Sequence, residues 1–93
     1  MNFKDPRMDK FELSLHAIEQ MKNRGVPKEI VFEVLENPDK IDVENEGQLI
    51  YQKVVLFDEV KQYLVRVFVN SDKTPNLVKT VYRTSKLSKY QWK

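Results

Sequence analysis

The feature that most constrains the fold is a change of hydrophobic period at Pro38. Before this proline, apolar residues recur at helical spacing in two groups: Leu15, Ile18 and Met21, then Ile30, Val31, Val34 and Leu35. After it, three stretches rich in Val, Leu, Tyr and Phe read as strands: 48–56, 62–69 and 76–83. Helices segregated from strands predict an α+β fold, with two N-terminal helices packed on one face of a three- to four-stranded antiparallel sheet.

The residues at the predicted boundaries support the two helices. Ser14 suits an N-cap, so we expect the first helix over 15–24, ended by Gly25 in a left-handed conformation. Pro27 suits the first position of a second helix, and Pro38 forces that helix to end before it. The short link between the helices predicts a helical hairpin.

Short strands and tight links organise the rest of the chain. Residues 11–13 and 40–43 are short strand candidates, and 57–61 forms a hairpin loop between the two central strands. Residues 70–75 make a polar loop before the last strand. Because the links are short, the strands are expected to form an antiparallel meander. We expect a flexible arm over 1–10 and a single domain over 11–93 that ends in a basic tail.

Composition excludes several classes of protein. The chain has 93 residues and no cysteine, so disulfide frameworks and thiolate zinc sites are excluded. With a single histidine as well, neither a metal nor another cofactor is expected. No apolar run is long enough to span a bilayer, and the first ten residues have no signal-peptide core. The sequence therefore predicts a cytoplasmic protein with no membrane partner.

Charge is distributed unevenly along the chain. Residues 1–52 contain 7 basic and 11 acidic residues, whereas residues 53–93 contain 9 basic and 3 acidic ones. A basic half joined to an acidic half is typical of an anion-binding surface. Solvated lysines on an ordinary protein surface are the alternative explanation.

His16 is the only histidine and a candidate general base. At the second position of the first predicted helix it lies in the positive end of the helix dipole, which disfavours the charged ring. A neutral imidazole accepts a proton near pH 7. The alternative is a surface or half-buried histidine with a structural hydrogen bond.

Arg66 lies in the middle of an apolar strand, 63–69. On the open face of the sheet it can bind phosphate through two parallel hydrogen bonds. A salt bridge to Asp58 or Glu59, or simple solvation, is the alternative.

The last strand is rich in groups that suit phosphate. Alternation places Thr80, Tyr82 and Thr84 on one face and Lys79 and Arg83 on the other. Tyr51 and Lys53 share a face of a neighbouring strand and are further candidates. Tyr90 and Trp92 in the tail either stack on bases or pin the tail to the domain.

The chain also resembles a family of short bacterial domains of unknown function. The resemblance rests on His16-Ala17, the turn at Arg24-Gly25 and a second helix ending in Asn37-Pro38. Tyr51, the strand 63–67 and the run 79–82 fit its later elements. This family is similar to BrnT-like and RelE-like toxins of toxin–antitoxin pairs, small metal-independent ribonucleases with helices packed on a four-stranded antiparallel sheet.

This resemblance implies cleavage of RNA by attack of the ribose 2′-hydroxyl on the adjacent phosphate. His16 would be the base or acid, Arg66 would stabilise the phosphorane, and Thr80 or Tyr82 would position the phosphate or assist proton transfer. The implied RNA-binding residues are Lys53, Lys79, Arg83 and Lys86. The implied partners are RNA, free or on the ribosome, and a cognate antitoxin.

Two other functions are compatible with the sequence. A non-catalytic RNA- or protein-binding module needs the same basic face but no convergent acid–base set. A structural domain or degenerate toxin needs a packed His16 and an Arg66 paired with an acid, and homodimerisation through the sheet edge would support it.

Overall fold

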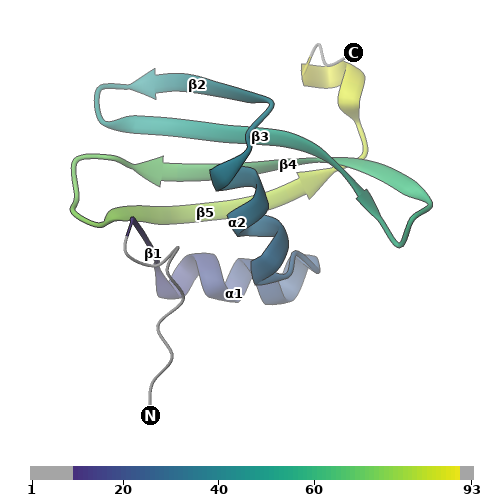
Figure 1. The fold of residues 1–93 in the computed structure, drawn as a ribbon, viewed down its shortest axis with the longest axis horizontal. Coiled ribbons are helices and arrows are strands. Elements are labelled where there is room, and N and C mark those ends of the chain that lie inside the picture. The colour runs from purple at the N-terminus through teal and green to yellow at the C-terminus, as the bar shows by residue number, and fades with distance from the viewer. Residues whose placement is uncertain (1–9, 91–93) are drawn as a thin grey trace.

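A computed structural model describes residues 10–90 as two helices against one five-stranded sheet (Figure 1). The elements, in chain order, are β1 Phe11–Leu13, α1 Leu15–Arg24, α2 Lys28–Glu36, β2 Lys40–Asn45, β3 Gln48–Phe57, β4 Lys61–Asn70, β5 Asn76–Thr84 and the 3₁₀ helix η2 Leu87–Tyr90. The expected arm over 1–10 lies almost entirely outside the described residues, as does Trp92. Neither described helix has the length and apolar character that crossing a bilayer requires.

The sheet is mixed, with the strand order β1-β5-β4-β3-β2. Strands β2 to β5 form the predicted antiparallel meander, but β1 pairs in parallel with β5, from Phe11 opposite Asn76 to Leu13 opposite Val78. The prediction of a purely antiparallel sheet of three to four strands was therefore wrong. A three-residue strand far from its partner in sequence leaves no pattern that indicates its direction.

Local sequence signals set the ends of both helices. Ser14 caps α1 by accepting a hydrogen bond from the amide of Ala17 at 3.0 Å, and Gly25 ends this helix with φ of 66°. Pro27 is the N-cap of α2, one position before the predicted one, and the helix ends at Glu36. The α+β order and both helices are confirmed.

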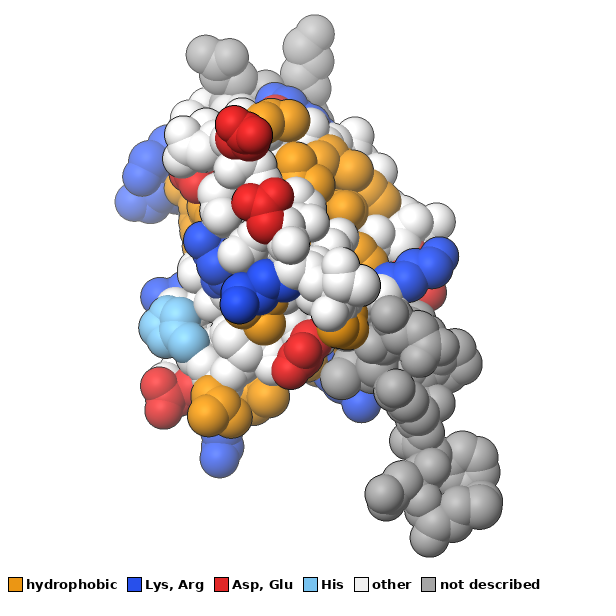
Figure 2. All heavy atoms as spheres, turned by 90° about the vertical axis from the view of Figure 1, so that its left-hand side faces the viewer, with side chains coloured by type: hydrophobic (Ala, Val, Ile, Leu, Met, Phe, Trp, Pro, Cys, Tyr) orange, Lys and Arg blue, Asp and Glu red, His pale blue; other side chains and the backbone are white. Residues whose placement is uncertain are grey.

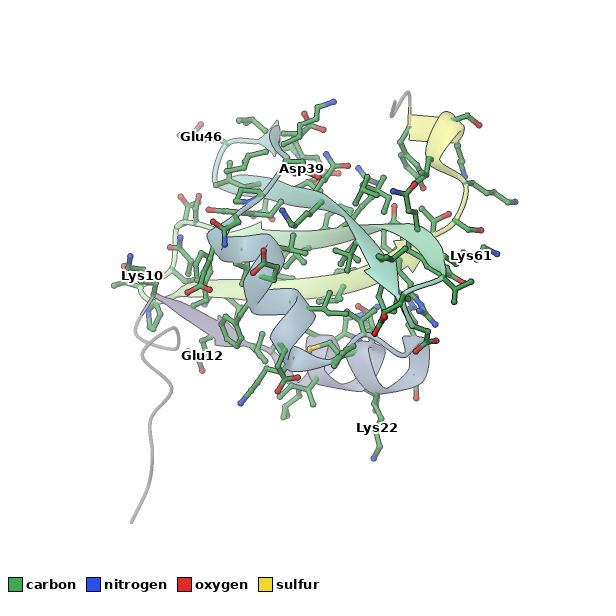
Figure 3. All side chains as sticks on the ribbon, turned by 45° about the vertical axis from the view of Figure 1, so that its right-hand side comes forward. Lys10, Glu12, Lys22, Asp39, Glu46 and Lys61 are labelled. Atoms are coloured by element: carbon green, nitrogen blue, oxygen red, sulfur yellow. The ribbon has the colours of Figure 1, made fainter. Side chains whose placement is uncertain are left out.

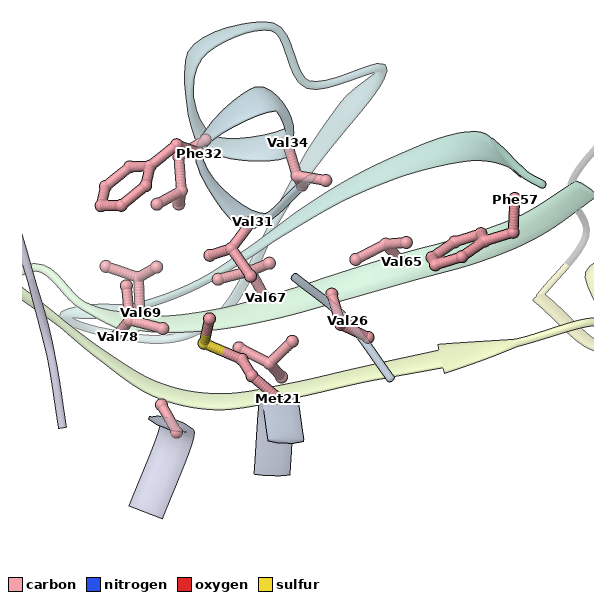
Figure 4. Close-up of a cluster of buried hydrophobic side chains, with 13 residues drawn as sticks. Met21, Val26, Val31, Phe32, Val34, Phe57, Val65, Val67, Val69 and Val78 are labelled. Atoms are coloured by element: carbon pink, nitrogen blue, oxygen red, sulfur yellow. The ribbon is translucent and has the colours of Figure 1, made fainter. Parts of the chain in front are cut away.

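One hydrophobic core joins both helices to the sheet (Figure 4). Val65, Val67 and Val69 of β4 face Val31 and neighbouring residues of α2, and all of these are fully buried. Each such side chain contributes about 1.5–3 kcal/mol through burial. Figure 1 shows α2 crossing in front of the sheet while α1 runs along β5. We call this side of the sheet the helix face and the other side the open face.

Side chains of α1 close the edge of β5 beyond the short β1. The backbone of Ser14 donates to the carbonyl of Val78 at 3.0 Å. Further along, Gln20 Oε1 accepts from the amide of Val81 at 2.9 Å, and Arg24 donates to the carbonyl of Val81 at 3.0 Å. These contacts satisfy backbone groups that an exposed edge strand would leave open to another chain.

A β-bulge interrupts β5 at Lys79. Val69 pairs with Val78, whereas Phe68 pairs with Thr80, so Lys79 is the extra residue. The bulge breaks the alternation expected for this strand. The amino group of Lys79 donates to Gln48 Oε1, and Gln48 lies on the open face by its register with Asn70. Alternation predicted that Lys79 shares a face with Arg83, and this prediction was wrong.

Candidate nucleic-acid interface

Three neighbouring strands bring Gln52, Arg66 and Tyr82 side by side on the open face. Gln52 is paired in register with Arg66, and Arg66 with Tyr82. Because directly opposed residues of antiparallel strands point to the same face, the three side chains form one row. This row lies opposite the valines that pack against α2.

Hydrogen bonds hold the guanidinium of Arg66 in a fixed orientation. Its Nε donates to Gln52 Oε1 at 2.9 Å, and its Nη1 donates to the hydroxyl of Tyr82. Gln52 is only 2% exposed, and its Nε2 donates to Asp42 Oδ2 on β2 at 2.6 Å. Both ends of this buried amide are therefore satisfied, and it connects Asp42 to Arg66.

Three aromatic rings surround the same guanidinium. Its Cζ lies 4.6 Å from the ring centroid of Tyr90, 5.3 Å from that of Phe68 and 5.6 Å from that of Tyr82. Phe68 and Tyr82 are stacked with centroids 6.0 Å apart. We refer to Gln52, Arg66, Phe68, Tyr82 and Tyr90 as the Arg66 cluster.

The two tyrosine hydroxyls of the cluster are 3.1 Å apart and influence each other's ionisation. Burial raises the pKa of Tyr82, the hydrogen bond to Tyr90 raises it further, and the nearby Arg66 partly offsets both effects. The same hydrogen bond lowers the pKa of Tyr90. Tyr82 therefore keeps its proton at neutral pH and is a proton donor rather than a base.

Arg66 makes no ion pair with an acid among residues 10–90, and Asp42 is connected to it through Gln52. The alternative of a salt bridge to Asp58 or Glu59 is therefore wrong. A guanidinium carries five N–H groups; here Nε bonds Gln52, Nη1 bonds Tyr82, and Arg66 also interacts with the hydroxyl of Tyr90. The remaining N–H groups can bind an anion.

His16 lies on the exposed surface of α1, as the pale blue side chain in Figure 2 shows. Its Nε2 is 2.8 Å from Gln20 Nε2. Gln20 Oε1 already accepts from Val81, so this amide nitrogen is the donor and His16 Nε2 the acceptor. This assignment places the ring proton on Nδ1.

One row of α1 carries His16, Gln20 and Arg24, at intervals of four residues, along the edge of β5. Arg24 ends this row with its Cζ 5.9 Å from the ring centroid of Tyr82. The row therefore reaches the Arg66 cluster through Arg24. His16 itself makes no hydrogen bond or ion pair with Arg66, Thr80 or Tyr82.

The other candidates on β5 and beyond it divide between the two faces. Thr80 pairs with Phe68 and lies on the open face with Tyr82, and Lys79 reaches the same face through the bulge. Lys86 is exposed just after β5, where its amide is bound by Thr84 Oγ1 at 3.1 Å.

Lys53 and Arg83 lie on the helix face, away from Arg66. Lys53 donates to the carbonyl of Asn37 at 2.9 Å and lies 3.5 Å from Asp39 and 4.0 Å from Glu33, so it caps the end of α2. The guanidinium of Arg83 lies beside Phe57 and Tyr63, with its Cζ 4.3 and 4.5 Å from their ring centroids. The structure therefore places these two cations apart from the Arg66 cluster, and their expected RNA-binding role stays a prediction.

Sequence reasoning missed Gln52, Phe68 and Gln20. Gln52 carried a usable signal, since a polar residue inside an apolar strand and opposite an arginine points to a buried hydrogen bond. Tyr90 pins the tail to the domain, as one of the two alternatives for it predicted. No group of three or more His, Asp and Glu side chains in the part of the chain that the structure describes is arranged to hold a metal ion.

Comparisons with known proteins give one result. The chain matches a domain of unknown function, DUF4258, over residues 13–83. No curated protein and no solved structure matches it significantly. Because the matched region includes both helices and nearly all of the sheet, the protein belongs to the DUF4258 family.

Proposed function

We propose that the protein is a metal-independent endoribonuclease that binds RNA on its open face and acts as the toxin of a type II toxin–antitoxin pair. The observation that carries the proposal is the Arg66 cluster. It combines an arginine without a carboxylate partner, a protonated tyrosine hydroxyl and three aromatic rings. These groups suit a phosphate and the bases beside it.

The chemistry is attack of a ribose 2′-hydroxyl on the adjacent phosphate. The new O–P bond forms as the bond to the 5′-oxygen breaks, leaving a 2′,3′-cyclic phosphate and a 5′-hydroxyl. Arg66 stabilises the charge on the phosphorane, and Tyr82 donates a proton to the leaving oxygen. Thr80 and Lys79 hold the neighbouring backbone.

His16 is the base in this scheme, because its Nε2 lone pair is held in the acceptor state by Gln20. The resemblance inferred from the sequence implies the same role. For the reaction, the 2′-hydroxyl replaces the amide of Gln20 as the partner of Nε2.

The second candidate is a non-catalytic RNA-binding module. The observation that favours it is the contact between His16 and Gln20, because a histidine already bonded within its helix is also an ordinary structural residue. The third alternative, a structural domain, predicted a packed His16 and an Arg66 paired with an acid, and homodimerisation through the sheet edge would support it. His16 is exposed and Arg66 makes no such pair within residues 10–90.

The test is cleavage of bulk RNA by purified protein in the presence of a chelator, with and without ribosomes. The variants are Arg66→Ala, Tyr82→Phe and His16→Ala. The matched control is Lys28→Ala, which removes one exposed cation at the start of α2. We expect 2′,3′-cyclic phosphate ends, a loss of cleavage of about 10²-fold or more in each of the three variants, and no change in Lys28→Ala.

The outcomes separate the candidates. The binding module is supported if RNA is not cleaved with or without ribosomes and RNA binding is sensitive to salt. In that case Arg66→Ala should weaken binding and His16→Ala should not. Cleavage that survives Arg66→Ala removes the Arg66 cluster from the mechanism.

The toxin role has its own test. Expression of the chain alone is expected to arrest growth, and expression of Arg66→Ala at the same level is not. An antitoxin is expected to cover the open face, so its binding and RNA binding should exclude each other.

A further inference from the structure

The two edges of the sheet differ in whether other parts of the chain cover their backbone groups. At the β5 edge, β1 and the side chains of Ser14, Gln20 and Arg24 occupy the backbone groups. At the other edge, β2 pairs only with β3, and no described helix or strand lies beyond it in Figure 1. An unpaired edge strand is a template for another strand.

The free edge also carries exposed apolar side chains. Ile41 is 46% exposed and Val43 is 73% exposed, and both lie on the helix face by their register with Tyr51 and Leu49. Two β-branched residues that alternate along an edge strand are suited to pair with a further strand on that side.

We infer that β2 pairs antiparallel with β2 of a second copy of this chain, forming a two-fold dimer with one continuous sheet. A two-fold axis perpendicular to the sheet keeps each side chain on its own face. We place the axis at the middle residue of 40–44, the part of β2 that precedes Asn45; the register with β3 is regular from Lys40 to Val43 and shifts between Val43 and Asn45. The axis therefore passes beside Asp42.

This register is complementary in both shape and charge. It places Ile41 opposite Val43 of the second copy, twice, on the helix face. It also places Lys40 opposite Glu44 of the second copy, twice. Cross-strand apolar pairs and opposite-charge pairs both stabilise antiparallel strands.

The register also places Asp42 opposite Asp42 of the second copy, and this like-charge pair is unfavourable. Figure 3 shows Asp39 and Glu46 at the two ends of β2, away from its centre. At the centre, Asp42 is bound by Gln52 and lies 3.7 Å from Lys40 of its own chain. The charge of each central carboxylate is therefore partly offset by partners within its own chain.

The dimer has a consequence for the open face. Each protomer contributes a five-stranded sheet, and the two-fold axis places both Arg66 clusters on the same side of the joined sheet. A single strand pair is a small interface, so we expect a reversible dimer that forms in the micromolar range or above.

The test is the oligomeric state of the full chain, without RNA, by sedimentation across micromolar to millimolar concentrations. We expect a monomer–dimer equilibrium that Val43→Lys abolishes. Lys40→Glu or Glu44→Lys alone should weaken dimerisation roughly 2- to 30-fold, because the symmetry changes two pairs at once. The double variant Lys40→Glu/Glu44→Lys should recover part of the loss, because Lys40→Glu also removes the contact with Asp42 of its own chain.

A matched control and a second measurement fix the register. Lys22→Glu makes the same charge change on α1, where Lys22 points away from the sheet in Figure 3, and should leave dimerisation unchanged. The chain has no cysteine, so Asp42→Cys should form a disulfide-linked dimer on oxidation, and Glu44→Cys should not. A monomer at every concentration, or a dimer insensitive to Val43→Lys, overturns the inference.

Discussion

Gly47 occupies a position that no residue with a side chain fits easily. Its φ is 78°, and a Cβ atom there would lie 2.2 Å from Asp72 Oδ2. The carbonyl of Gly47 also accepts from the amide of Ser71 at 2.9 Å, which joins the β2–β3 turn to the loop before β5. The turn therefore depends on glycine both for its backbone conformation and for its contact with Asp72.

Gly47→Ala is expected to lower the free energy of unfolding by about 1–2 kcal/mol, since a left-handed conformation strains any residue with a Cβ. Chemical denaturation measures the change. Asp72→Ala in the same chain should remove only the collision with the carboxylate and recover only part of the loss. A neutral Gly47→Ala would show that this turn tolerates another backbone conformation.

At the scale of elements, Lys53 connects the end of α2 to the sheet. Its side chain is 22% exposed and bonds the carbonyl of Asn37. Lys53→Met keeps the stem and removes the charge, so we expect a loss of about 1 kcal/mol in the free energy of unfolding. The affinity for RNA should fall no more in Lys53→Met than it does in Lys28→Ala. A large loss of RNA affinity without loss of stability would return Lys53 to the RNA-binding set.

The short helix η2 brings Tyr90 onto the Arg66 cluster. Tyr90→Phe keeps a ring over Arg66 but removes the hydrogen bond that raises the pKa of Tyr82. We therefore expect the pKa of Tyr82 to fall toward its ordinary value, which NMR titration of labelled tyrosine measures. Tyr63→Phe on the helix face is the control and should leave Tyr82 unaffected. An unchanged or higher pKa in Tyr90→Phe would mean that η2 does not hold Tyr82 in solution.

Elements whose ends depend on neighbouring residues were predictable, and those that depend on distant contacts were not. Ser14 and Gly25 predicted the bounds of α1, and the hairpin from β3 to β4 was found within one residue at each side. The parallel pairing of β1 and the bulge at Lys79 arise from strand contacts far apart in sequence. Arg66 and Tyr82 could be identified as candidate site residues because the alternation of strand side chains holds on either side of the bulge. The contact of Lys53 with the end of α2 could not be predicted, because it joins residues that are distant in the sequence.

At the scale of the whole molecule, the position of a basic residue in the sequence does not tell on which face of the sheet it lies or whether an acid neutralises it. Lys53 belongs to the basic half of the sequence but is bound to acids and a carbonyl on the helix face. Arg66 and Lys79 lie on the open face without ion pairs to residues 10–90. We therefore expect the open face to be the surface that exchanges counterions for phosphates.

The salt dependence of RNA binding tests this expectation. For single-stranded RNA, the logarithm of the binding constant falls with the logarithm of salt concentration by about 0.7 for each phosphate contact. Arg66→Ala and Lys79→Ala should each reduce this slope by about 0.7, whereas Lys53→Met and Lys28→Ala should leave it unchanged. Affinities of the four variants over a salt series give the slopes directly. Equal changes in all four would mean that RNA responds to net charge alone, and the open face would then have no special part in binding.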